Sequence, residues 1–374
     1  LILVRDEWFL GFSVVTCVIF LLYGENLFAR LPEPSWLALV FIWLFTAVLG
    51  SALSAVRHAE QLATRLGEPY GTLILTLSVT FVEVTSIAAI MLHGDNNPTL
   101  ARDTMFAVAM IILNGMIGLS LLVGGWRHGE QRYNLQGANA YLGVIIPLAV
   151  LSLVLPNFTK TTPGPIFSHA QDIFLVAVGL GLYSTFLAVQ TRRHHSFFRL
   201  DADATHEQIA GNGEPGHPAP RSRPRPVLAH STLLIAYILP VVFLAEQFAH
   251  PVDYLIETLR VPAPLGGVII AAVVATPEAI SAVRAAVANH MQRAVNIFLG
   301  SVLSTIGLTV PAIVLVSRMV GREIVLGLEH TDLVMLLLTL SVCIVTFSSG
   351  RTNVMQGAVH FVLFLVYLAL IFQG

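Results

Sequence analysis

Apolar runs of about 20 residues recur along the whole of this 374-residue chain, and they constrain its fold more than any other feature. A helix of that length crosses the hydrocarbon layer of a bilayer and satisfies its backbone hydrogen bonds within itself. Hydrophobic residues make up 55% of the chain and charged residues only 11%, whereas roughly one quarter of a soluble domain is charged. We therefore predict an all-α polytopic membrane protein whose surroundings are the lipid bilayer.

Eleven such runs can be placed along the chain. Their approximate spans are Trp8 to Tyr23, Trp36 to Val56, Tyr70 to Leu92, Thr104 to Gly124, Ala138 to Pro156, Ser168 to Gln190, Leu228 to Ala249, Leu265 to Ala288, Ala294 to Ser317, Thr331 to Phe347, and Val354 to Phe372. The first run is interpreted as a retained helix and not a signal peptide, because Asp6 and Glu7 stand where a signal has basic residues and no cleavage site follows.

A polar segment, residues 191–227, divides the chain into two halves. It is rich in arginine and proline, so we predict a cytoplasmic linker that is too polar and too broken to pack. Thirteen of the 20 Lys and Arg residues then fall on the linker's side of the membrane and six on the other side. By the positive-inside rule this bias predicts a cytoplasmic N-terminus and a C-terminus on the other side of the membrane.

The two halves show signs of an inverted repeat. Setting aside the helix in residues 1–30, five runs precede the linker and five follow it, and an odd number per half requires that related halves be inverted. Gly71 precedes Glu83 by twelve residues, and Gly266 precedes Glu278 by twelve. The next run carries Asn-Gly-Met-Ile-Gly-Leu from position 114 in one half and Ser-Thr-Ile-Gly-Leu from position 304 in the other.

A second likeness does not fit this repeat. Asn134-Leu-Gln-Gly-Ala resembles Asn353-Val-Met-Gln-Gly-Ala, but these segments precede the fifth and the eleventh run. We interpret this likeness as coincidence or as a local role in the two loops.

Glu83 and Glu278 are the candidate functional residues, one in each half. A charged side chain at the centre of a membrane helix costs on the order of 3 kcal/mol or more, so a functional role has to be considered. Thr80 shares the face of Glu83. Pro277 removes a backbone hydrogen bond beside Glu278, so the helix is expected to open there and free carbonyls, with the Thr276 hydroxyl at the break.

The helices that follow each glutamate offer further oxygen ligands. Asn114, Ser301 and Ser304 lie on polar faces there and are candidates to face an ion, although close helix packing also explains such rows. Two carboxylates with hydroxyl and carbonyl oxygens suit calcium, while sodium or potassium can use the same ligands. Because carboxylates must lose their protons to bind a metal ion, cation and proton compete for one site, which is the basis of antiport.

Together, these residues resemble a known family. The segments Thr76 to Val84, Arg102 to Thr104, Pro277 to Ala282, Gln292 to Pro311 and Phe347 to Val354 look like those of the ChaA-type calcium (sodium, potassium)/proton antiporters of the calcium/cation antiporter superfamily. The resemblance implies exchanger-type membrane repeats at 31–190 and 228–374. It also implies one acidic residue per repeat at the ion site, which places Glu83 and Glu278 there as metal and proton ligands.

Other classes of function find little support. The net charge of −2 and the scattered basic residues do not indicate a nucleic-acid surface. Neither a His-Glu-x-x-His nor a Gly-x-Ser-x-Gly motif is present, so a membrane hydrolase is disfavoured, as is a channel. We expect a transporter and not an enzyme, without a resident cofactor. The sequence leaves open whether the protein forms a homo-oligomer.

Overall fold

The computed structural model describes residues 7–67, 70–93, 98–193, 195–198 and 226–373. Within these residues, nine helices are long and apolar enough to cross a membrane, and two shorter apolar helices, Leu73–Ala89 and His330–Thr346, bring the number to eleven. The prediction of an all-α polytopic membrane protein with about eleven crossings is confirmed.

The helices follow the predicted runs, with different ends. In the first half they are α2 (Trp8–Phe28), α3 (Pro34–Leu66), α4 (Tyr70–His93), α5 (Leu100–Met110), η1 (Ile111–Met116), α6 (Ile117–His128), α7 (Leu135–Ala149), η2 (Val150–Val154), η3 (Leu155–Phe158), α8 (His169–Ala188), η4 (Val189–Arg193) and η5 (His195–Phe198). In the second half they are α10 (Val227–Asp253), η6 (Tyr254–Thr258), α11 (Ala263–Val287), α12 (Met291–Ser304), η7 (Thr305–Thr309), α13 (Val310–Val320), α14 (His330–Thr346) and α15 (Val354–Ile371). Two short strands, β1 (Gln131–Arg132) and β2 (Arg351–Thr352), complete the described elements.

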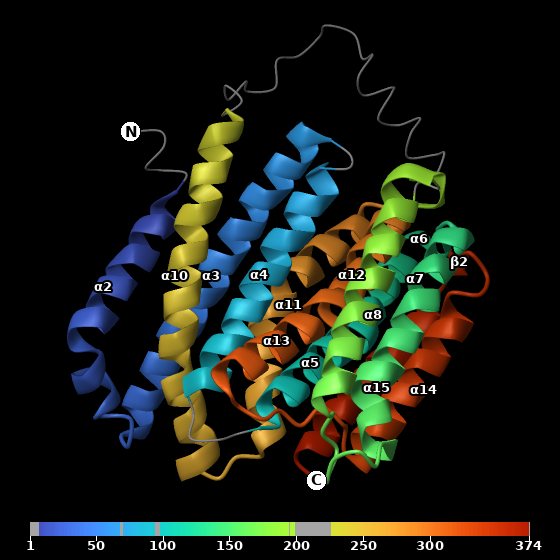
Figure 1. Cartoon of the computed structure of the whole chain (residues 1–374). Coiled ribbons are helices and arrows are strands. Elements are labelled where there is room, and N and C mark those ends of the chain that lie inside the picture. The colour runs from blue at the N-terminus through green and yellow to red at the C-terminus, as the bar shows by residue number, and fades with distance from the viewer. Residues whose placement is uncertain (1–6, 68–69, 94–97, 194, 199–225, 374) are drawn as a thin grey trace, which may run out of the picture.

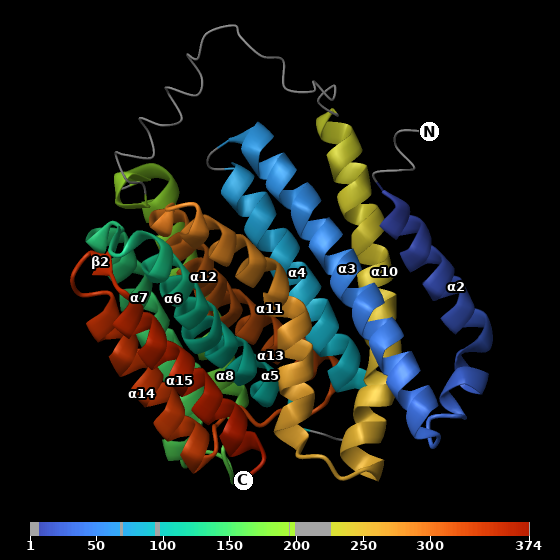
Figure 2. The same ribbon diagram turned by 180° about the vertical axis from the view of Figure 1, so that it is seen from behind.

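The helices alternate in direction through the molecule (Figures 1 and 2). α2 and α10 begin on the same face, which we call the linker face, and α15 ends on the opposite face. The two helices that carry the glutamates, α4 and α11, run in opposite directions through the middle of the molecule. The opposite directions of the two equivalent helices agree with an inverted relation between the halves.

Two membrane crossings change helix type in the middle. The crossing Leu100–His128 contains the π-helical segment η1, and the crossing Met291–Val320 contains η7. These are the crossings in which the sequence likeness between the halves was found, and Asn114 lies in η1 while Ser304 directly precedes η7. Short π-helical segments are uncommon and frequently mark functional sites.

The second sequence likeness has a local structural role. β1 and β2 pair as antiparallel strands, and the helix that follows each strand begins at an asparagine. The Asn134 side chain accepts hydrogen bonds from the backbone of Gln136 and Gly137, and Asn353 accepts one from Gln356. The shared motif is therefore a strand followed by an asparagine cap, used twice in adjacent loops.

The start of the predicted linker packs against the helices, contrary to our expectation. Phe198 is only 6% exposed, and its carbonyl accepts a hydrogen bond from the Asn296 side-chain amide at 2.8 Å. Phe198 also packs edge-on against the ring of Tyr141. The apolar Phe197–Phe198 pair explains this, because it buries hydrophobic surface that the surrounding polar residues cannot. Residues 199–225 of the linker lie outside the described part of the chain.

Close packing joins α6 to α15. A Cβ atom on Gly118 would lie 2.6 Å from the backbone nitrogen of Phe361, and one on Gly357 would lie 2.5 Å from that of Leu122. Backbone atoms at this distance cannot move aside as a flexible side chain can. These glycines therefore allow the two helices to approach each other, as small residues do in membrane helix pairs.

We expect Gly118→Ala and Gly357→Ala to destabilise the protein by about 1–3 kcal/mol each, because the added methyl group overpacks the α6–α15 contact. The matched control is Gly143→Ala, since a Cβ atom there meets nothing within 4 Å and alanine favours the helix. The measurement is the unfolding temperature of the detergent-purified protein. A rise in stability for all three variants would contradict the packing argument.

Candidate functional site

Glu83 is buried in the interior and both of its carboxylate oxygens are paired. It is 1% exposed. Its Oε1 accepts a hydrogen bond from the Thr305 hydroxyl at 2.9 Å, and its Oε2 accepts one from the Thr309 hydroxyl at 2.7 Å. The two threonines are four residues apart in η7, so both hydroxyls face the same side of the π-helical segment. The helix that carries Glu83 thus meets the π segment of the opposite half.

Glu278 has the opposite environment. Both of its carboxylate oxygens are buried, and neither has a hydrogen-bond partner among the described residues. It is nevertheless close enough to Glu83 for the two carboxylates to interact electrostatically. An ionised carboxylate without a partner is very unfavourable in a protein interior, so Glu278 must either carry a proton or hold a cation.

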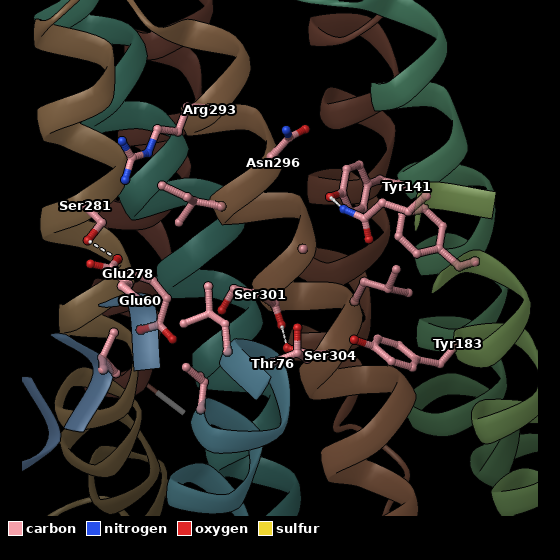
Figure 3. A pocket seen from close by; sticks show the side chains of 18 residues that line it. Glu60, Thr76, Tyr141, Tyr183, Glu278, Ser281, Arg293, Asn296, Ser301 and Ser304 are labelled. Atoms are coloured by element: carbon pink, nitrogen blue, oxygen red, sulfur yellow. Dashed lines mark hydrogen bonds between the residues drawn. The ribbon is translucent and has the colours of Figure 1, made fainter. Parts of the chain in front are cut away.

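A cavity of about 400 Å³ adjoins Glu278 (Figure 3). Side chains from α3, α4, α7, α8, α11 and α12 and the π-helical residue Gln190 line it. Gln190 follows the end of α8, while Arg293 and Asn296 lie near the start of α12, and these helix ends are on the linker face. The cavity therefore extends from Glu278 towards the linker face. Glu83 is not among the residues that line it.

Ser301 and Ser304, two of the predicted supporting residues, line this cavity. The Ser304 hydroxyl donates to the Ser301 carbonyl at 2.8 Å. Thr80 is 7% exposed, and its hydroxyl is buried without a hydrogen-bond partner among the described residues. These three residues thus place polar groups near the two carboxylates or in the space that leads to one of them.

The backbone at Pro277 and the hydroxyl of Thr276 differ from what the sequence predicted. The helix was expected to open at Pro277, but α11 continues through it from Ala263 to Val287. The Thr276 hydroxyl donates to the Ala272 carbonyl at 2.5 Å, within its own helix. Packing on several sides holds the helix together, and the missing proline N–H removes only one bond of the ladder. The carbonyl of Val273 is the group that this proline deprives of its usual donor.

The structure places Asn114 away from the cavity, in a separate buried polar network. Its side-chain amide donates to the Thr339 hydroxyl at 2.8 Å, and its carbonyl oxygen lies 3.4 Å from Nδ1 of His360. His360 also contacts the Thr346 hydroxyl at 2.9 Å. This network joins η1 to α14 and α15, and it satisfies polar groups that would otherwise be unpaired in the membrane interior.

The sequence analysis missed three residues at this site. Thr305 and Thr309 continue the row that begins at Ser301, at intervals of four residues, and that spacing was the signal that could have identified them. Glu60 was missed because it lies beyond the predicted end of the second run, whereas α3 continues to Leu66. Glu60 lines the same cavity as Glu278.

The sequence of this chain matches a known protein family and several transporters. The sodium/calcium exchanger protein family matches residues 36–192 and 230–373. The chain is 38% identical to the sodium-potassium/proton antiporter ChaA of Escherichia coli K12, over 98% of this chain and 97% of that protein. It is 43% identical to the putative ionic transporter y4hA of Sinorhizobium fredii, over 91% and 90% of the two chains. A Ca(2+)/H(+) antiporter of Aphanothece halophytica is 23% identical over 87% and 88%.

Solved structures share the fold. The structure of native YfkE superposes with a TM-score of 0.70 at 19% identity, covering 96% of this chain and all of that one. The H+/Ca2+ exchanger CAX superposes with a TM-score of 0.65 at 15% identity, covering 98% and 88%. On the family match and the identity to its relatives, this chain is a multi-pass membrane protein that belongs to the sodium/calcium exchanger family.

Proposed function

We propose that this protein exchanges a cation for protons across the bacterial inner membrane, with Glu83 and Glu278 as the shared site. The observation that carries the proposal is that both carboxylate oxygens of Glu278 lack a partner among the described residues and adjoin a cavity that extends towards the linker face. A proton neutralises this carboxylate, and so does a cation, but the binding of one displaces the other. Competition at one buried group couples the two fluxes without a second site.

The geometry also supports alternating access. The cavity extends from the linker face to Glu278. Glu83 does not line this cavity, and its carboxylate accepts hydrogen bonds from two hydroxyls of η7. The distribution of arginines makes the linker face cytoplasmic, with the N-terminus inside and the C-terminus in the periplasm. In this arrangement the structure corresponds to a cytoplasm-facing state, and transport requires a second state that opens to the other face.

Calcium is the substrate that the oxygen ligands favour. Two carboxylates supply the charge that balances a divalent ion, and hydroxyls of Thr80, Ser301 and Ser304 with the carbonyl of Val273 add neutral oxygens. Sodium or potassium is the second candidate, because the chain is 38% identical to a sodium-potassium/proton antiporter. To distinguish calcium from the monovalent cations, each chloride salt is added separately to everted vesicles, and the dissipation of a pH gradient is measured.

We expect Glu278→Gln to abolish exchange while the protein still folds, because glutamine keeps the shape but neither attracts the cation nor carries the transported proton. Loss of a buried partner costs roughly 3 kcal/mol or more, which corresponds to a loss of at least about 100-fold in apparent affinity. Glu83→Gln should behave alike. Glu33→Gln is the control, since Glu33 is exposed and forms an ion pair with the exposed Arg30. Proton-coupled flux that survives in Glu278→Gln would refute the shared site.

Competition predicts a pH effect in the parent protein. Lowering the pH on the side from which the cation loads should raise the half-saturating cation concentration, and the maximum rate should recover at saturating cation. The measurement is the initial rate of cation-induced pH-gradient collapse at several external pH values. A fall in the maximum rate with an unchanged half-saturating concentration would argue against direct competition.

Substitution of two threonines near the site should distinguish a hydroxyl that stabilises the fold from one that binds the cation. Thr309→Val removes a donor from Glu83, and a hydrogen bond to a charged group contributes about 1.5–3 kcal/mol, so stability should fall. Thr80→Val removes a buried hydroxyl that has no partner among the described residues, so stability should be kept while the half-saturating cation concentration rises. Unfolding temperature and transport are measured on both variants. An unchanged cation dependence in Thr80→Val would exclude Thr80 as a ligand.

A further inference from the structure

The cavity holds a second carboxylate on its wall, that of Glu60. Glu60 lies in the last two turns of α3, so it is nearer to the linker face than Glu278 is. Its Oε1 accepts a hydrogen bond from the Ser281 hydroxyl at 3.5 Å, and Ser281 stands three residues after Glu278 on α11. This contact joins the two helices and points the Glu60 carboxylate towards the wall that carries Glu278.

Glu60 and Glu278 line the same cavity. Figure 3 shows their side chains next to each other on one wall of the cavity, and the two carboxylates are close enough to interact electrostatically. Both oxygens of Glu278 are buried and without a hydrogen-bond partner in the described residues. A cation between the two carboxylates would be attracted by both and would satisfy oxygens that no described protein group satisfies.

The cavity also contains an opposing charge. Arg293 lines it near the linker face, and it makes no ion pair with any residue that the structure describes. A guanidinium at this position repels an arriving cation, so a carboxylate further in is needed to make the path attractive. Glu60 supplies that charge.

We propose that Glu60 is a cation-loading ligand, which with Ser281 and Glu278 forms a second cation-binding position between the linker face and the shared site. The ligand is an inorganic cation that retains part of its hydration shell, because the cavity is large and only one wall carries carboxylates. The inference deepens the proposed function and rests on it. Its distinctive consequence is that Glu60 acts on loading from one face only.

The test compares loading from the two faces. Everted and right-side-out vesicles are given calcium chloride and, in parallel, sodium chloride, and initial rates of proton-coupled exchange are measured. Glu60→Gln should raise the half-saturating concentration about tenfold when the cation loads from the linker face, because one nearby charge is lost. The maximum rate and the loading from the other face should stay near those of the parent protein.

Two further variants sharpen the test. Arg293→Gln should change the half-saturating concentration in the opposite direction, on the same face, because it removes a repelling charge. If Glu60→Gln does not reach the membrane, the half-saturating concentration of Arg293→Gln on the linker face tests the loading site in its place. Glu130→Gln is the matched control, because Glu130 is exposed, outside the cavity, and on the same face between α6 and β1.

The outcomes distinguish this inference from the function on which it rests. An unchanged half-saturating concentration in Glu60→Gln would overturn the loading site, and so would equal changes on both faces. Glu278→Gln, measured in the same vesicles, tests the proposed function itself. If Glu278→Gln abolishes exchange from both faces and Glu60→Gln behaves like the parent, the shared site stands and the loading site does not.

Discussion

The cost of burying a carboxylate inside a bilayer governs this structure. A carboxylate in the membrane interior needs hydrogen-bond donors, a proton or a cation, and the two glutamates meet this need in different ways. Glu83 takes two threonine hydroxyls from η7, while both oxygens of Glu278 are buried without a donor among the described residues. The helices α4 and α11 bring these two groups together, and the cavity extends from the linker face towards Glu278.

The fold achieves this with opposed helices and two changes of helix type. α4 and α11 run in opposite directions, so their midpoints meet in the centre of the molecule. Each packs near a crossing that contains a π-helical segment, and η7 directs two hydroxyls four residues apart at a single carboxylate. Gly118 and Gly357 let α6 and α15 pack closely on the far side of η1.

Much of the fold could be predicted from the sequence, because the membrane imposes a simple rule. In an all-α membrane protein each segment that crosses the lipid is an apolar helix, so apolar runs located the eleven crossings of the described residues. The helix ends were less predictable, since α3 continues through polar residues to Leu66. The start of the linker was wrongly expected to stay unpacked, because the linker is polar overall whereas Phe198 is buried.

The candidate site was predictable only in part. A glutamate in an apolar run is conspicuous, so Glu83 and Glu278 could be found from local sequence. The hydrogen-bond partners of Glu83 come from a segment more than 200 residues away, and no local pattern states which hydroxyl faces which carboxylate. Asn114 matched the polar pattern as well as Ser304 did, yet its amide is taken up by Thr339 and His360. Tertiary contacts, which the sequence does not display, decide between such residues.

The difference between the two glutamates agrees with a cavity that extends from Glu278 towards the linker face. In two inverted halves, equivalent groups have equivalent surroundings only if the whole molecule is symmetric across the membrane. A cavity that reaches one face breaks that symmetry, so one carboxylate adjoins the cavity while the other is enclosed by hydroxyls. Under the proposed mechanism, opening to the other face must rearrange the contacts between α4 and η7. The hydrogen bonds of Thr305 and Thr309 to Glu83 are thus among the interactions that hold the present state, and their free energy contributes to the barrier between the two states.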